Sequence, residues 1–473
     1  MQYALFAFFL ITTPIFAMDV HSVEEKLAEI NQQHLLKHWD TLNREQRQEL
    51  ATELETIDNA TFREQQTVFA GRHTLPRPAD VKPFTDFDSS GNIDDIARGR
   101  QIAREGAVGC LITAGGSGSR LRYDAPKGSY PLSPIKKKSL FQLFAEKVAA
   151  ASKQAGTPLP LAIMTSPEND AETRAFFADH GNFGLDDGQL FFFTQGHLPY
   201  LDEEGNLFLE TPNHIAMGPD GNGTTLTHFV RSGIWQQWQE RGVRCINYVL
   251  IDNVLAEPFD HELIGYHDRC GSQVTLKATE RIDPKEKVGT IVMSGGDVVV
   301  REYSEISDAV RYAEDNQGSL LHRCANLSLF CFDMTFVADV AEKALPWHLA
   351  HKAVKYLDAG GNTVRPQSPN AWKFEKFIFD CLPEAQRVRA LLYPRNQCFA
   401  PLKNAEGSDS PETVRRSLQE RDRQVLKEIT GMEPPDGEIE IDPQFYYPTD
   451  DLLQRWKGKK PTHAGYIAAD EAS

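Results

Sequence analysis

The chain has few cysteines and no closely spaced pair of them. Seven occur in 473 residues, an odd number, without the short spacings typical of zinc sites or disulfide frameworks. We therefore expect them to be small core residues in a protein of a reduced compartment. The sequence also contains no internal repeat and no long low-complexity tract, which excludes a repeat architecture.

Basic residues are also fewer than acidic residues. The chain has 50 lysines and arginines against 67 aspartates and glutamates, for a formal net charge of -17. A polyanion such as DNA would be repelled on average, so we expect no nucleic-acid partner. Any anionic ligand should be small and bound at a local site. Single hydrophobic cores stop growing well below this length, which predicts more than one domain.

An apolar run opens the chain at residues 1–17, MQYALFAFFLITTPIFA. It is short for a membrane span and ends in an alanine suited to cleavage, but no Lys or Arg precedes it. Two interpretations stay open. The run is either a signal peptide or a mis-called start, with Met18 opening the true chain. We favour the second, because the motifs described in the following paragraphs indicate an intracellular ligand.

The rest of the sequence alternates between helical and strand-like patterns. Residues 20–69 have apolar residues at helical spacing, and the Pro- and Asp-rich residues 75–92 predict a linker. Strands are then predicted at 107–115, 159–166, 189–196, 243–253 and 272–280, and helices at 139–156, 167–181 (with a proline in its first turn), 229–242 and 259–271. This alternation predicts an α/β fold with a mostly parallel sheet between helices. Ligands of such folds bind beyond the carboxyl ends of the strands.

A glycine-rich loop follows the first of these strands, in GCLITAGGSGSRL at residues 109–121. It is not a Walker A loop, because no Gly-Lys-Ser/Thr ends it, and the dinucleotide fingerprint fails where Leu121 replaces its third glycine. Arg120 closes the loop, and Lys127 follows in APKGSYPL. Bare backbone N–H groups and two cations at one strand end predict a polyphosphate site. A purely structural turn is the alternative.

Several motifs resemble those of the UDP-sugar pyrophosphorylases, in particular the eukaryotic-type UDP-N-acetylglucosamine pyrophosphorylases. They are LITAGGSGSRL, PKGSYPL, KSLFQL, MGPDGNG (217–223), LIDN (250–253), VREYSEI (300–306), LHRCANLSLF (321–330), FEKFIFD (374–380) and PLKNAEGSDSP (401–411), in the family's order. The resemblance implies a Rossmann-like, GT-A-like nucleotidyltransferase core with an N-terminal helical segment and a small C-terminal domain. It also implies a magnesium-dependent conversion of UTP and a sugar 1-phosphate into a UDP-sugar and pyrophosphate.

We expect the domains to follow this scheme along the chain. Residues 1–17 are the leader or mis-called start, 18–98 the helical segment with its linker, 99–395 the catalytic domain, and 396–473 the C-terminal domain.

The phosphates and the metal ion call for positive charge and a carboxylate. By resemblance, the triphosphate is bound by Arg120, Lys127 and Lys403 and by the loop residues Ala114, Gly115, Gly116 and Gly118. Asp252 ends the apolar strand INYVLIDN, and the resemblance makes it the ligand of Mg²⁺ (or Mn²⁺). Asp220 is a weaker candidate, because Asp-Gly is first of all a turn former.

The base and the sugar are matched to neutral and aromatic residues. The resemblance assigns Gln195 and Gly221 to the nucleotide. It assigns the sugar to Asn222, Glu302, Asn326, Lys373, Phe377 and Phe379, the last two lining a pocket for the 2-substituent. Taken alone, two phenylalanines at strand spacing would be core residues.

The acceptor sugar stays open. Thr224 follows Gly223 where the family favours a further glycine, and this departure puts the acceptor in doubt. N-acetylglucosamine 1-phosphate is the first choice, with glucose 1-phosphate, galactose 1-phosphate or a broad range of sugars behind it. An alternative of another class is a non-catalytic sugar-nucleotide binding protein or a glycosyltransferase. Glycosyltransferases of similar architecture usually carry two aspartates at the metal, whereas this chain has Asp252-Asn253. We expect a cytoplasmic enzyme, monomeric or homo-oligomeric, without stable membrane association.

Overall fold

The computed structural model describes residues 20–72, 81–461 and 463–471. The apolar run at residues 1–17 lies outside them. The chain has two compact units. Among the described residues, the smaller contains 20–72 together with Leu198–Gly218 and Leu349–Phe374, and the larger contains 81–197, Pro219–His348 and the described part of 375–471. The N-terminal helices thus share a unit with two later segments, a grouping that no linear domain boundary can express.

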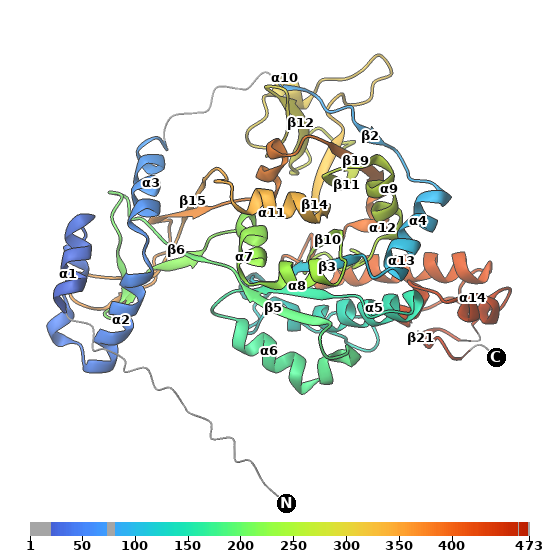
Figure 1. Cartoon of the computed structure of the whole chain (residues 1–473), viewed down its shortest axis with the longest axis horizontal. Helices are drawn as coiled ribbons and strands as arrows, with labels where there is room; N and C mark the ends of the chain where they lie inside the picture. Colours follow the sequence, from blue (N-terminus) through green and yellow to red (C-terminus); the bar gives the residue numbers. More distant parts are fainter. Residues whose placement is uncertain (1–19, 73–80, 462, 472–473) are drawn as a thin grey trace, which may run out of the picture. The chain divides into compact units, whose positions relative to one another are not determined.

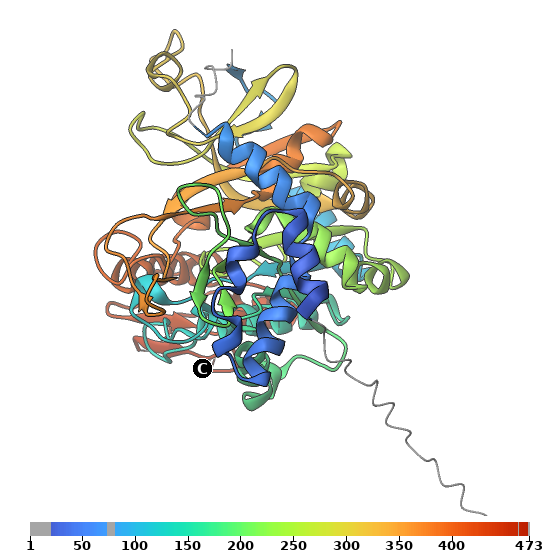
Figure 2. The same cartoon turned by 90° about the vertical axis from the view of Figure 1, so that its left-hand side faces the viewer.

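The smaller unit is built on the predicted N-terminal helices, which are the dark blue ribbons of Figure 2. They are α1 (Val20–Glu29), α2 (Arg44–Thr56) and α3 (Asn59–Ala70). A capping box starts α2, where the Asn43 side chain accepts from the Gln46 N–H and the Gln46 side chain accepts from the Asn43 N–H. The later segments add short strands, whose end residues His197, Pro219, His348 and Glu375 belong to the larger unit. They are β6 (His197–Pro199) paired with β9 (Met217–Pro219), β7 (Leu209–Thr211) with β8 (His214–Ile215), β16 (Tyr356–Leu357) with β17 (Thr363–Val364), and β15 (His348–Lys352) with β18 (Ala371–Glu375).

The larger unit is built on an 11-stranded mixed sheet (Figure 1). Four neighbouring strands are parallel, β10 (Cys245–Leu250), β3 (Val108–Thr113), β4 (Leu161–Thr165) and β5 (Leu190–Thr194). Strand β14 (Cys324–Asp333) runs antiparallel to both β10 and β11 (Val274–Glu280), and β19 (Val388–Tyr393) and β2 (Phe87–Asp88) continue parallel to β11. Strands β1 (Val81–Pro83), β12 (Thr290–Ser294) and β13 (Asp297–Arg301) form an antiparallel extension. The predicted mostly parallel α/β sheet is confirmed.

Helices cover both faces of this sheet, as the sequence predicts. Side chains alternate along β3, so Cys110 and Ile112 join one core cluster and Leu111 joins the other. The first cluster includes residues of α4 (Ile93–Arg104), α5 (Leu140–Ala155) and α9 (His261–Cys270), and the second those of α7 (Thr225–Arg231), α8 (Ile234–Glu240) and α11 (Met334–Ala341). Every residue of β3 and β4 is buried, which accounts for the nearly continuous run of apolar residues in both strands.

Three local expectations differ from the structure. The helix expected at 229–242 is two helices, α7 and α8, because Gly233 between them adopts φ +80°. Helix α6 (Asp170–Asp179) begins after Pro167, so this proline precedes the helix rather than lying in its first turn. In the expected linker at 75–92, β1 pairs with β12 and β2 with β19, so the described part of that segment belongs to the sheet.

The C-terminal segment has its own small core within the larger unit. It contains α13 (Pro411–Thr430), α14 (Asp450–Trp456) and the parallel strands β20 (Ile439–Ile441) and β21 (Gly465–Ile467). None of the described helices combines the length and the hydropathy of a membrane span. The seven cysteines are free thiols. Six of them are buried, which confirms their prediction as core residues, whereas Cys270 is only partly buried.

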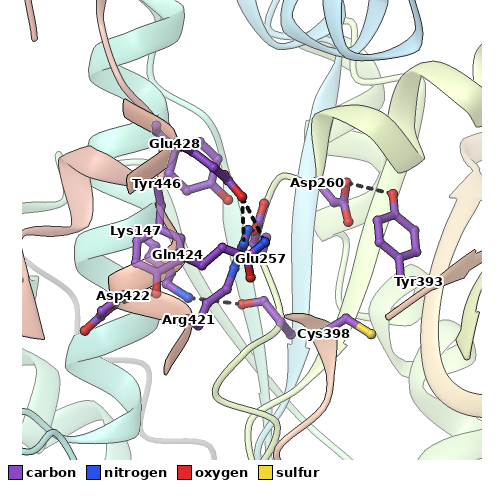
Figure 3. Close-up of polar contacts among 12 residues, drawn as sticks. Lys147, Glu257, Asp260, Tyr393, Cys398, Arg421, Asp422, Gln424, Glu428 and Tyr446 are labelled. Atoms are coloured by element: carbon purple, nitrogen blue, oxygen red, sulfur yellow. Dashed lines mark hydrogen bonds and ion pairs between the residues drawn. The ribbon is translucent and has the colours of Figure 1, made fainter. Parts of the chain in front are cut away.

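Buried polar contacts join α13 to the rest of the larger unit (Figure 3). Arg421 donates to Glu257 at 3.3 Å, and the Tyr446 hydroxyl donates to Asp422 at 2.6 Å. The Lys147 ammonium lies 4.4 Å from the centre of the Tyr446 ring. Burial raises the pKa of Asp422 to about 7 and lowers the pKa of Lys147 to about 8. The fold therefore holds ionisable groups in its interior whose protonation depends on pH near neutrality.

Candidate functional site

The loop after β3 is packed tightly at two of its glycines and is open at the third. A Cβ on Gly115 would lie 2.7 Å from Nε2 of Gln195, and a Cβ on Gly118 would lie 2.5 Å from the carbonyl oxygen of Tyr123. A Cβ on Gly116 would meet nothing within 4 Å, and Gly116 is exposed. Packing thus explains why Gly115 and Gly118 lack side chains. The bare backbone at Gly116 instead faces open space.

The start of the loop is fixed to the sheet. The Ala114 N–H donates to the carbonyl of Met164 at 2.7 Å, and the Gln195 N–H donates to the carbonyl of Thr165 at 2.9 Å. These bonds place Ala114 and Gln195 just beyond β3 and β5, at the carboxyl edge of the sheet.

The two cations that follow the loop differ in their surroundings. Arg120 lies in a short 3₁₀ turn and is exposed, and its carbonyl accepts from the N–H of Ala405 at 3.2 Å. The ammonium of Lys127 is largely buried, 3.3 Å from the carbonyl oxygen of Leu402 and 3.8 Å from Oδ2 of Asp252. The structure therefore brings Lys127 to the carboxyl end of β10, as the prediction of a shared site requires.

Asp252 and its neighbour Asn253 have different roles at the end of β10. The backbone carbonyl of Asp252 accepts from the Leu402 N–H at 2.8 Å, while its carboxylate lies on the side of Lys127. The Asp252 side chain is 18% exposed. Asn253 is buried. Its amide donates to the carbonyl of Cys398 at 2.8 Å and accepts from the Ala400 N–H at 2.9 Å. Asn253 thus fixes the segment that leads into Lys403.

Lys403 follows directly on this fixed segment. Its N–H donates to the carbonyl of Asp409 at 2.8 Å, and its ammonium lies 5.9 Å from the centre of the Phe399 ring. Segments from residues 114–127, 252–253 and 400–403 therefore meet at one edge of the sheet.

The donor set at Asp252 is compatible with magnesium. No cluster of three or more His, Cys, Asp or Glu side chains suited to a metal occurs among the described residues. Mg²⁺ commonly takes one or two carboxylates and completes its shell with phosphate oxygens and water. Asp252 meets that requirement only if a phosphate is present. Asp220, the weaker candidate, instead accepts from Nε2 of His228 at 3.2 Å.

Gly221 and Asn222 pack against the segment that begins with FEKF. Gly221 adopts φ +89°, a conformation that favours glycine. The Gly223 N–H donates to the carbonyl of Lys376 at 2.8 Å, and the Asn222 side chain accepts from the Ile378 N–H at 3.1 Å. The predicted sugar contact Asn222 therefore lies beside the predicted aromatic pair Phe377 and Phe379.

Glu302 and Asn326 meet across a glycine. A Cβ on Gly289 would lie 3.2 Å from Oε1 of Glu302 and 3.8 Å from Cβ of Asn326. Asn326 lies at an irregularity of β14, where its side chain accepts from the Ser328 N–H at 3.0 Å. Burial raises the pKa of the Glu302 carboxyl, and the nearby Glu305 adds to the effect. Glu302, one of the predicted sugar contacts, is thus a partly buried carboxyl group.

Phe377 and Phe379 do not lie on a strand, so the strand spacing was misleading. Phe377 precedes a 3₁₀ segment, Ile378–Glu384, and the two rings are 5.1 Å apart between centroids. Phe379 is 7% exposed and Phe377 is half-buried. Both rings contact His348, whose centroid lies 4.5 Å from that of Phe377 and 6.3 Å from that of Phe379.

His348 and its partner Asp380 were not singled out by sequence reasoning. Nε2 of His348 donates to Oδ2 of Asp380 at 2.8 Å. No short motif marks a lone histidine 32 residues before its partner, although Asp380 is the last residue of FEKFIFD. Lys373 lies on β18 in the smaller unit, and its role near the sugar phosphate stays a prediction.

The parallel strands β10, β3, β4 and β5, with a bare loop, a lysine and a lone aspartate at their carboxyl edge, have the arrangement of a Rossmann-like nucleotide-binding protein. The chain belongs to the UTP–glucose-1-phosphate uridylyltransferase (UDPGP) family, whose sequence model matches residues 76–424.

Relatives and solved structures agree with this assignment. The chain is 36% identical over 355 residues to the probable UDP-N-acetylglucosamine pyrophosphorylase of Schizosaccharomyces pombe, covering 71% of this chain and 74% of the relative. It is 30% identical over 470 residues to the UDP-N-acetylglucosamine pyrophosphorylase of Saccharomyces cerevisiae, covering 93% and 98%. The crystal structure of the Trypanosoma brucei UDP-N-acetylglucosamine pyrophosphorylase with an inhibitor superposes with a TM-score of 0.79 at 26% identity, covering 93% and 95%.

Proposed function

We propose that the protein transfers the uridylyl group of UTP to N-acetylglucosamine 1-phosphate, forming UDP-N-acetylglucosamine and pyrophosphate. The observation that carries the proposal is the meeting of Lys127, Asp252 and the open backbone at Gly116 at one edge of the sheet. The names of the relatives in Schizosaccharomyces pombe and Saccharomyces cerevisiae support this sugar.

The reaction needs positioning and positive charge rather than a covalent enzyme intermediate. A phosphate oxygen of the sugar 1-phosphate attacks the α-phosphorus of UTP in line, and the bond from that phosphorus to the pyrophosphate oxygen breaks. Lys127, Arg120 and Lys403, with the amides of the loop at residues 114–118, bind the phosphates and stabilise the charge that develops on them.

Asp252 is the residue that would hold Mg²⁺ or Mn²⁺, together with phosphate and water oxygens. When bound, the ion neutralises phosphate charge and helps pyrophosphate leave. Lys127, 3.8 Å from the same carboxylate, keeps a positive charge beside it. Lys127 would therefore offer positive charge to the phosphates, and Asp252 would offer negative charge to the ion.

The base and sugar contacts follow from the arrangement of the remaining residues. Gln195, packed on Gly115, and Gly221, packed on the backbone of Lys376, bind the uracil side of the nucleotide. Asn222, Glu302 and Asn326 bind sugar hydroxyls. Phe377 and Phe379 contact the 2-acetamido group, and the role of Lys373 near the sugar phosphate follows from the resemblance alone.

Thr224 and Asn253 bear on the alternatives. The Thr224 hydroxyl donates to the carbonyl of Gly221 at 3.2 Å. The threonine that replaces the family's glycine therefore uses its hydroxyl on the backbone of its own turn. Both ends of the Asn253 amide are used on the backbone of residues 398–400, so this position serves structure and is no second acid for a glycosyltransferase metal site. Since UTP is an intracellular metabolite, the proposal places the enzyme in the cytoplasm.

The test is release of pyrophosphate from UTP with a panel of sugar 1-phosphates. We expect the highest kcat/KM with N-acetylglucosamine 1-phosphate, and a preference for glucose or galactose 1-phosphate would contradict the proposed acceptor. Lys127→Ala should abolish turnover, whereas Lys343→Ala, which alters a surface lysine beside Glu384, is the matched control and should not. No pyrophosphate with any sugar would refute the transferase function.

A further inference from the structure

His348 completes an aromatic wall with Phe377 and Phe379, and nothing above gives it a role in the reaction. Its ring is tilted by 43° against Phe377 at 4.5 Å and is edge-on to Phe379 at 6.3 Å. The three rings together are called the aromatic wall below. Unlike the two phenylalanines, His348 brings a polar atom to this surface.

Asp380 fixes the orientation of the wall. Its Oδ2 accepts from Nε2 of His348 at 2.8 Å and from the N–H of Phe377 at 3.4 Å. One carboxylate therefore holds both the imidazole and the backbone of its aromatic neighbour. Because Nε2 is used on Asp380, Nδ1 is the ring atom left for another partner. In the part of the chain that the structure describes, no group hydrogen-bonds to Nδ1, and 27% of the side chain is exposed.

Carboxylates near His348 favour its protonated form. Burial opposes protonation, but the hydrogen bond to Asp380 and the charges of Asp380, Glu305 and Glu302 outweigh it and raise the pKa of His348. The pKa of Glu302 is raised by burial, by Glu305 and by Asp380, and the charges of His348 and Lys403 only partly oppose this rise. A protonated imidazole donates from both nitrogens, so Nδ1 becomes a hydrogen-bond donor while Nε2 stays on Asp380.

We propose that His348 positions the sugar by donating from Nδ1 to the carbonyl oxygen of its 2-acetamido group, while Phe377 and Phe379 contact the methyl group. The proposal rests on the proposed function and adds a specificity residue to it. A site that offers a hydrogen bond to one substituent rejects the sugar that lacks the acceptor, because the polar group of the site is then left unpaired. His348 should therefore act on the choice between N-acetylglucosamine 1-phosphate and glucose 1-phosphate.

The first experiment compares the two sugars in His348→Phe, with His214→Gln as the control at a half-exposed histidine of the smaller unit. We expect kcat/KM for N-acetylglucosamine 1-phosphate to fall at least tenfold, mainly through KM. The kcat/KM for glucose 1-phosphate and the KM for UTP should change less than twofold. Equal losses with both sugars, or no loss with either, would overturn the proposal.

The second experiment follows pH and does not depend on whether His348→Phe folds. In the wild type, kcat/KM for the acetylated sugar should fall as pH rises through the pKa of His348, while the value for glucose 1-phosphate should lack this fall. Asp380→Asn removes the carboxylate that favours protonation, so the fall should move to lower pH. Identical pH profiles for the two sugars, or a fall that Asp380→Asn leaves in place, would overturn the proposal.

The outcomes separate this inference from the proposed function. A wild-type enzyme that releases no pyrophosphate with any sugar refutes the proposed function, and the role of His348 with it. If the wild-type enzyme prefers the acetylated sugar and His348→Phe does not change that preference, the proposed function stands and only the role of His348 is refuted.

Discussion

Two glycines of one loop give a sharp test of the phosphate site. Gly116→Ala adds a Cβ where nothing lies within 4 Å, whereas Gly118→Ala adds one 2.5 Å from the backbone oxygen of Tyr123. Neither glycine has the positive φ that would strain an alanine. The two variants therefore differ in the space available to the new methyl group, not in backbone strain, at two sites of the same loop.

The expected magnitudes follow from those distances. Overpacking typically costs about 1–3 kcal/mol, so Gly118→Ala should lower the free energy of unfolding by that amount. Gly116→Ala should leave it unchanged or raise it by about 0.4–1 kcal/mol, because alanine restricts the unfolded chain. If UTP phosphates approach the bare backbone at Gly116, the new methyl group should raise the KM for UTP at least tenfold, or about 1.4 kcal/mol of binding.

The assays are denaturant unfolding of both variants and steady-state pyrophosphate release with varied UTP. The signature is a stable Gly116→Ala with impaired UTP use beside a destabilised Gly118→Ala. A Gly116→Ala enzyme with the wild-type KM and kcat would refute the inference that this backbone contacts phosphate.

Three further predictions concern Asp252, Asn253 and Asp422. Asp252→Asn should lower kcat/KM more than 100-fold at any Mg²⁺ concentration yet change the free energy of unfolding by less than about 1 kcal/mol, since Asn keeps the shape of the side chain and the 3.8 Å contact with Lys127 is too long for a hydrogen bond; activity close to wild type would show that it holds no metal. Asn253→Asp removes the donor to Cys398 and should destabilise the fold by about 1–3 kcal/mol, measured by denaturant unfolding, and an unchanged midpoint would contradict its structural role. Because burial raises the pKa of Asp422 to about 7, the folded state takes up a proton that the unfolded state has lost above about pH 4. Stability should thus fall as pH rises from 4 to 7, by at most about 1.4 kcal/mol per pH unit from this group, and the fall should be shallower in Asp422→Asn; identical slopes in the two proteins would argue against the shift.

The sheet and the phosphate end of the site were predictable because local patterns encode them. Strands β3 and β4 are buried on both faces, so they read as continuous apolar runs, and the carboxyl edge of a parallel sheet places Gly116 near Asp252 without knowledge of the packing. The break between α7 and α8 had a signal in Gly233, which adopts a left-handed conformation.

The sugar end of the site depends on tertiary packing and was only partly predictable. Phe377 and Phe379 have the spacing of a strand, but a 3₁₀ segment begins between them and turns both rings toward His348. The hydrogen bond from His348 to Asp380 joins residues that no periodicity connects. Likewise, Asp252-Asn253 showed one acid and one amide, but only the structure shows that the amide fixes residues 398–400.

The most direct measurement of the central claim is calorimetric titration of UTP into the wild-type protein in the presence of Mg²⁺. We expect saturable binding of one UTP per chain, weakened at least tenfold by Gly116→Ala and by Lys127→Ala. No heat of association with either UTP or UDP-N-acetylglucosamine would contradict it.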